Sequence, residues 1–245
     1  MKFSIIQNIG FKFSVLIYFL VVLPFVSFSK DEDENVFKVT WFDARDSIII
    51  HDTLNDSIPK IVYSYNGVAK SVVDYLEGQN SPLELGSYLS NKLGVEIDPN
   101  QALLLNMVAS YYGLTDIVGD SNNAQVLQFF TETDHPEITD DDMSWCSVYM
   151  SWCAKNVNLE RSTSLLARSW LEVGQIIDTP QPGDLVIFWR EKQKSWQGHV
   201  SIFLSEDPET HQIFCIGGNQ DDKVCVKPYP AEQVLGYRRL TVEQQ

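Results

Sequence analysis

The 245-residue chain carries 18 Lys and Arg against 33 Asp and Glu, a net charge of −15, and 44% of its residues are apolar. The length fits one large or two small domains, and the apolar fraction suffices for a core. Wholly disordered, collagen-like and coiled-coil proteins are therefore excluded. The acidic balance argues against nucleic acid as a partner, because phosphate binding needs clustered lysine and arginine.

Residues 1–29 have the pattern of a secretory signal peptide. Lys2 and Lys12 are their only charged residues, an apolar run covers 13–28, and small residues precede a cleavage point before Lys30. An uncleaved anchor is the alternative, although the run is short for a membrane span. Basic residues before the run and acidic ones after it place the remainder outside the cytoplasm under both interpretations. We expect a periplasmic or extracellular protein, with no stable membrane partner once the signal peptide is cleaved.

The region 30–99 is predicted to be an accessory region of unknown role. The segment 37–53 reads as two strands, and the apolar spacing over 68–76 and 83–93 predicts helices that stop at Gly78 and Gly94. No set of residues in this region suggests a reaction.

The region 100–240 is predicted to be the main domain, of the α+β class. Helical patterns come first and strand patterns follow, which is the order of an α+β domain with an antiparallel sheet. The helices are expected at 101–113, at 123–130, from about residue 145 and at 164–174, and the strands at 185–189, 199–207, 211–218, 222–229 and 235–240.

Cys146 is the candidate nucleophile. It lies in the expected first turn of a helix, where the positive end of the dipole lowers the pKa of a thiol. Its backbone N–H has no intrahelical partner and is free to stabilise an oxyanion. A small buried hydrophobic residue, or half of a disulfide, is the alternative interpretation.

His199 is the candidate general base, because it opens an apolar strand directly after Gly198. Asn219 follows the next strand, and neighbouring antiparallel strands bring the start of one beside the end of the other. We therefore expect Asn219 to orient the imidazole, with Asp184 and Asp221 as replacements. A plain hairpin turn is the other interpretation of the sequence around Asn219.

Seven short motifs in this order resemble an NlpC-like/CHAP-like family of bacterial and phage cysteine peptidases, over about residues 104–240. They are Asp142-Met143-Ser144-Trp145-Cys146, Leu166-Ala167-Arg168-Ser169-Trp170-Leu171, Pro182-Gly183-Asp184, Phe188-Trp189-Arg190, Trp196-Gln197-Gly198-His199-Val200, Gly217-Gly218-Asn219-Gln220 and Leu235-Gly236-Tyr237-Arg238. The family commonly has proline where this chain has Ser144, which affects the entry into the helix and not the reacting atoms.

The resemblance implies a papain-like core, with helices packed on an antiparallel sheet, and a peptidoglycan hydrolase. The bond cut would be that of an endopeptidase or of an N-acetylmuramoyl-L-alanine amidase. Cys146 would be the nucleophile, His199 the base and Asn219 the orienting group. Stem peptides of the wall would be the partner, and neither a cofactor nor a metal is expected. Trp145, Trp196, Asp142 and Gln220 are assigned to substrate binding.

The remaining cysteines do not suggest a metal site, since no C-x-x-C occurs. Cys153 lies two helical turns beyond Cys146, about 10 Å by helix rise, which is too far for a disulfide. Cys215 and Cys225 flank a hairpin, so a cross-strand disulfide and two buried thiols both stay open.

Three other functions stay open. They are a catalytically silent module of the same fold that binds wall peptides or a protein, an antibacterial effector controlled by an inhibitor or immunity protein, and an acyltransferase with an acceptor other than water.

Overall fold

The computed structural model describes residues 67–117 and 122–243, together with four strand backbones before them. The signal-peptide prediction rests on residues 1–29, and all of these except 26–29 lie outside the described residues. None of the helices in the described part of the chain has both the length and the hydrophobicity to span a bilayer.

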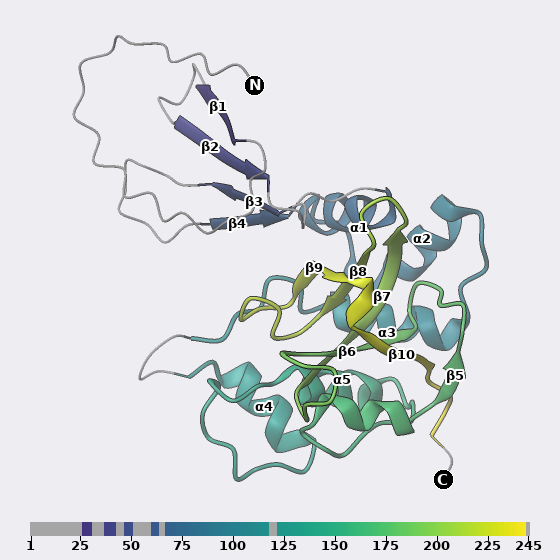
Figure 1. The fold of residues 1–245 in the computed structure, drawn as a ribbon. Coiled ribbons are helices and arrows are strands. Elements are labelled where there is room, and N and C mark those ends of the chain that lie inside the picture. The colour runs from purple at the N-terminus through teal and green to yellow at the C-terminus, as the bar shows by residue number, and fades with distance from the viewer. Residues whose placement is uncertain are drawn as a thin grey trace.

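The four early strands form an antiparallel sheet in the order β1-β2-β3-β4 (Figure 1). The sequence predicted two of these strands, β2 and β3, and missed the outer two. Their bounds are β1 Val26–Lys30, β2 Phe37–Phe42, β3 Ser47–Ile50 and β4 Lys60–Tyr63.

Local signals explain where the helices begin and end. Asp98 caps the third helix by accepting from the N–H groups of Asn100 and Gln101, and Gly94 ends the second with a left-handed φ of 64°. The α-helices are α1 Gly67–Glu77, α2 Leu85–Leu93, α3 Pro99–Ala109, α4 Ala124–Glu132 and α5 Cys146–Asn156. Short 3₁₀ segments are η1 Pro82–Glu84, η2 Ala167–Glu172 and η3 Ala231–Gln233. The helix expected over 164–174 is thus only the 3₁₀ segment η2.

The second sheet has six strands, and every neighbouring pair in it is antiparallel. Their order is β5-β10-β6-β7-β8-β9, so the last long strand, β10, lies between β5 and β6. The strands are β5 Gln175–Ile177, β6 Leu185–Trp189, β7 Gly198–Asp207, β8 Gln212–Gly217, β9 Cys225–Pro230 and β10 Val234–Arg239. Helices followed by an antiparallel sheet confirm the predicted α+β class.

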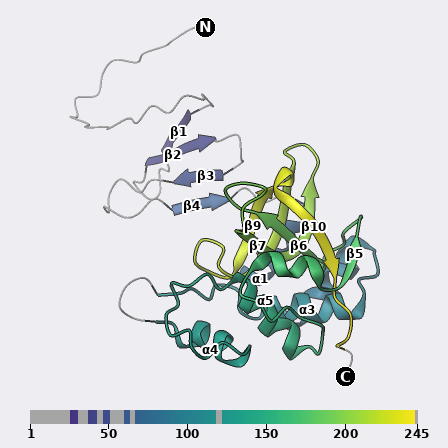
Figure 2. The same cartoon turned by 60° about the horizontal axis from the view of Figure 1, so that its bottom comes forward.

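The two faces of this sheet carry different apolar clusters. One face, with Ile187, Val200 and Ile202, joins the main core formed by the helices. Figures 1 and 2 both show α3 and α5 lying against the sheet. The opposite face carries a smaller cluster that includes Phe188 and Tyr229. Because residues alternate between the faces along β7, His199 and Val200 project to opposite sides of the sheet.

Candidate active site

Cys146 is the first residue of α5, and it is 4% exposed. No side chain caps this helix, so its first-turn amides have no capping acceptor. The backbone N–H groups of Cys146, Ser147 and Val200 all donate to the sulfur. Val200 follows His199 in β7, and the thiol therefore lies beside the residue that carries the imidazole.

Burial nevertheless raises the pKa of the Cys146 thiol above its ordinary value. The positive charge of Arg190 and the three N–H donors act in the opposite direction and are outweighed. The sequence predicted a lowered pKa from the helix terminus alone. The structure corrects this, because desolvation of a nearly enclosed sulfur disfavours its charged form more than the helix end favours it.

His199 is fully buried, and a glutamine sets its tautomer. The Gln220 side-chain N–H donates to the carbonyl of Cys225, which leaves its Oε1 directed at His199. This oxygen lies 3.0 Å from Nε2 of His199 and 3.1 Å from Oγ of Ser201. Because Oε1 can only accept, Nε2 carries the hydrogen and Nδ1 keeps a lone pair.

Gln220, and not Asn219, is therefore the side chain that contacts the imidazole. Asn219 has a left-handed φ of 55° and is only partly buried, and its side chain makes no hydrogen bond to His199. The left-handed residue turns the chain just after β8, so that the next side chain points inward. The sequence predicts the correct turn, but its pattern assigned the orienting role to Asn219 and substrate binding to Gln220.

Arg190, one residue beyond β6, occupies the other side of the imidazole. Its Nη2 lies 3.2 Å from Nδ1 of His199 and donates to the lone pair there. Burial and the Arg190 charge together lower the pKa of His199 to about 3. The resting site thus contains a neutral thiol and a neutral imidazole. Arg190 belongs to one of the seven sequence motifs, but the sequence predicted no role for it. The pairing of Phe188 in β6 with His199 in β7 brings Arg190 to the site.

Tyr229 completes the surroundings of the imidazole. Its ring stacks on that of His199, with centroids 5.1 Å apart, and on Phe188 at 4.6 Å. Burial raises the pKa of its hydroxyl well above the ordinary value, and the Arg190 side chain, which interacts with the hydroxyl as a charge and as a hydrogen-bond partner, acts in the opposite direction.

The other residues assigned to substrate binding have different positions. Trp145 is fully buried, packs beside Tyr149 and donates from Nε1 to Asp116 at 3.0 Å, so the structure places it in the core. Trp196 is 70% exposed, and Asp142 is also exposed. Substrate contact by these two residues stays a prediction.

The two replacement candidates for the orienting role are engaged elsewhere. Asp184 is fully buried. It accepts two hydrogen bonds of 2.8 Å from Arg239 and one of 2.7 Å from Gln101. It therefore links the sheet to α3. Asp221 forms an ion pair with Lys227.

All four cysteines are buried free thiols. Cys215 pairs with Lys227 and Cys225 with Gly217, so the hairpin register sets the two cysteines diagonally and not opposite each other. Of the two alternatives left open, the structure has the buried thiols. Cys153 lies in the core, where burial raises its pKa.

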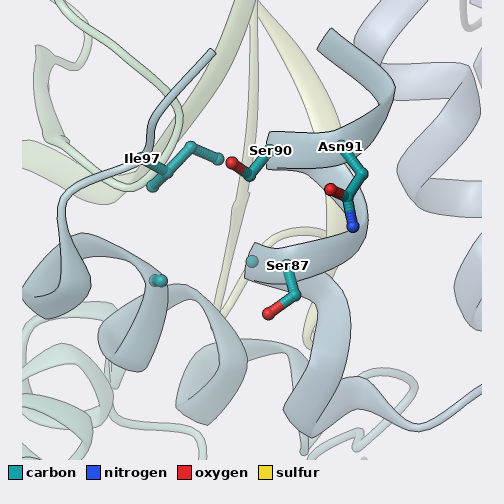
Figure 3. A pocket seen from close by; sticks show the side chains of 6 residues that line it. Ser87, Ser90, Asn91 and Ile97 are labelled. Atoms are coloured by element: carbon teal, nitrogen blue, oxygen red, sulfur yellow. The ribbon is translucent and has the colours of Figure 1, made fainter. Parts of the chain in front are cut away.

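Two other features of the described residues contain neither a cysteine nor a histidine. A hollow of about 300 Å³ lies by α2 and α3, and Figure 3 shows Ser87, Ser90 and Asn91 along it. It has neither a thiol nor an imidazole. The carboxylates of Asp140, Asp141 and Asp142 lie close enough to share a cation. Asp141 already accepts from the N–H groups of Ile117 and Asn123 and so joins two loops.

Comparison with known proteins leaves the family of this chain open. No family model and no curated protein matches it. One solved structure that matches part of this chain is described as similar to a lipoprotein of the NLP/P60 family, from Staphylococcus aureus subsp. aureus Mu50. The TM-score is 0.37 at 18% identity, and the match covers 63% of this chain and 46% of that one. This chain thus spans less than half of that protein's length.

Proposed function

We propose that this protein is an exported cysteine hydrolase that cleaves amide bonds of peptidoglycan, as an endopeptidase or an N-acetylmuramoyl-L-alanine amidase. The observation that supports the proposal is the position of Cys146 at a helix terminus, where its sulfur accepts from the N–H of Val200, the residue that follows His199 in β7. The peptidoglycan substrate rests on the seven ordered sequence motifs, and export rests on the pattern of residues 1–29.

The proposed reaction is acyl transfer through a thioester. His199 accepts the thiol proton at Nδ1, and the sulfur of Cys146 attacks the amide carbonyl. The oxyanion is stabilised by the N–H of Cys146, which lies at the positive end of α5. The protonated Nδ1 then gives its proton to the leaving amine as the carbon–nitrogen bond breaks.

Water completes the cycle. His199, neutral again, removes a proton from water as the oxygen attacks the thioester. The sulfur leaves, takes up the proton from Nδ1, and a carboxylic acid is released. Gln220 exchanges no proton during these steps. It accepts from Nε2 throughout, which keeps the Nδ1 lone pair directed away from Gln220 and available for proton transfer.

The first experiment measures release of soluble fragments from purified peptidoglycan. The unmutated protein should release them and Cys146→Ala should not, whereas the matched variant Cys153→Ala, in the core of the same helix, should retain activity. Mass spectrometry of the fragments would name the bond. Full activity in Cys146→Ala would disprove the assignment. Binding without release by the unmutated protein would favour the silent module.

A further inference from the structure

Arg190 differs from the other arginines of the described chain in what its guanidinium contacts. Arg161 and Arg239 pair with carboxylates, and Arg168 and Arg238 donate to backbone carbonyls. The guanidinium of Arg190 has no carboxylate or carbonyl partner among the described residues, and its hydrogen bond goes to the neutral Nδ1 of His199. A guanidinium has five N–H donors, so Arg190 has donors beyond those directed at His199 and Tyr229.

The surroundings of this guanidinium suit an anion. Arg190 is half-buried, and its positive charge acts on both the enclosed thiol and the enclosed imidazole. The buried Tyr229 hydroxyl lies beside the guanidinium and interacts with the Arg190 side chain, and its own O–H can serve as a second donor to an anion. The nearby Lys227 is paired with Asp221. Arg190 has no carboxylate partner among the described residues, and a guanidinium can bind a carboxylate through two parallel hydrogen bonds.

We propose that Arg190 binds a carboxylate of the substrate and that this contact withdraws the guanidinium from Nδ1 of His199. The second part rests on the proposed function, since it assigns to His199 the role of accepting the Cys146 proton. The resting contact blocks that role, because the lone pair is occupied and an imidazolium beside a guanidinium is electrostatically unfavourable. A carboxylate neutralises the guanidinium and competes for its N–H groups, so the base becomes available only when a substrate of the right charge is bound.

The test compares alkylation of Cys146 by iodoacetate and by iodoacetamide at pH 7.5. In both reactions the sulfur displaces iodide and forms a thioether, but only iodoacetate carries a carboxylate. The rates are followed by mass spectrometry of the peptide that contains Cys146. The ratio of the two rates is the informative quantity, because a change in the fraction of thiolate alters both rates equally and cancels.

We expect Arg190→Gln to lower the iodoacetate-to-iodoacetamide ratio at least tenfold, as loss of a charge-assisted hydrogen bond implies. The matched control Lys192→Gln removes the same charge from an exposed position two residues away and should leave the ratio unchanged. Arg190→Lys should give an intermediate ratio, since an ammonium keeps the charge without the planar pair of donors.

An unchanged ratio in folded Arg190→Gln would overturn the proposal, as would native protein whose Cys146 reacts with neither reagent. If Arg190→Gln does not fold, the native wild-type protein is compared with the same protein unfolded in urea. A native ratio at least tenfold higher supports the carboxylate site, and equal ratios reject it. None of these measurements uses peptidoglycan. A wild-type protein that shows the preference but releases no wall fragments would therefore disprove the proposed function alone.

Discussion

The indole of Trp145 packs directly on Gly218, and a Cβ at position 218 would lie 2.4 Å from Cζ3 of that ring and 2.5 Å from Cδ1 of Tyr149. Both aromatic residues belong to the start of the helix that carries Cys146, and Gly218 precedes the turn that presents Gln220. One close contact thus fixes the distance between the nucleophile's helix and the residue that orients the base.

Gly218→Ala should therefore both destabilise the protein and slow the reaction of Cys146. The methyl group has to displace two buried rings, which costs about 1–3 kcal/mol of unfolding free energy, measured by urea denaturation. Gly236→Ala is a suitable control, because its nearest contact would be the flexible end of Arg238 at 3.2 Å. Wild-type stability and labelling in Gly218→Ala would contradict this account.

Gln220→Ala should lower kcat strongly, while Asn219→Gly should have little effect. Loss of Oε1 removes the acceptor that fixes the His199 tautomer, and we expect a decrease on the order of 10²-fold. Glycine at 219 tolerates the left-handed backbone there, so this variant removes only the amide side chain. Rates of peptidoglycan hydrolysis for the two variants would decide between the residues. A larger loss in Asn219→Gly would return the orienting role to Asn219.

Acidification should destabilise the native state through His199. Its pKa is about 3 when folded and near the ordinary 6.5 when unfolded, so between these values only the unfolded chain binds the proton. Stability contributed by the neutral imidazole is present above pH 6.5 and is lost as the pH falls, by about 1.4 kcal/mol per pH unit. Between pH 7 and pH 5, the free energy of unfolding measured in urea should fall by about 2 kcal/mol less in His199→Asn than in the wild-type protein. Equal losses would mean that His199 is not held neutral.

Asp184→Ala should unfold the domain more readily without changing the chemistry of the site. Removal of this fully buried carboxylate leaves Arg239 and Gln101 without their shared partner. A cost of about 3–5 kcal/mol is typical of breaking a buried pair, and chemical denaturation would measure it. The fraction that stays folded should label at Cys146 at the wild-type rate. Slower labelling in that fraction would implicate Asp184 in the site.

The thiol should react faster as the pH rises past 9, since burial raises the pKa of Cys146 above that ordinary value. The iodoacetamide rate from pH 7 to pH 10 measures this in the free protein. A plateau already at pH 7 would show a stable thiolate, as the sequence predicted, and would contradict the resting state described above. This profile is independent of the charge preference assigned to Arg190.

Local sequence signals predicted most elements of the main domain, because they act within a few residues. Gly94 and the apolar spacing mark helix ends and faces, and alternation identifies β6 to β10. The short strand β5 was not predicted, and the segment 164–174 was predicted wrongly. Its apolar pattern fits an α-helix, yet only residues 167–172 are helical, and they form a 3₁₀ segment. There Trp170 is fully buried and donates to Ser147 of α5, so tertiary contacts prevail over the local pattern.

The sequence by itself determined that a thiol begins a helix, that a histidine begins a strand and that a polar turn follows the next strand. Only the tertiary structure decided that Gln220 and not Asn219 faces the histidine, that Arg190 covers the remaining nitrogen and that the cysteine pKa is raised. The physical reason is range. Helix starts and strand alternation follow from neighbours in the chain, whereas the direction of a side chain after a left-handed turn, and the desolvation of a sulfur, depend on segments that meet only in the folded protein.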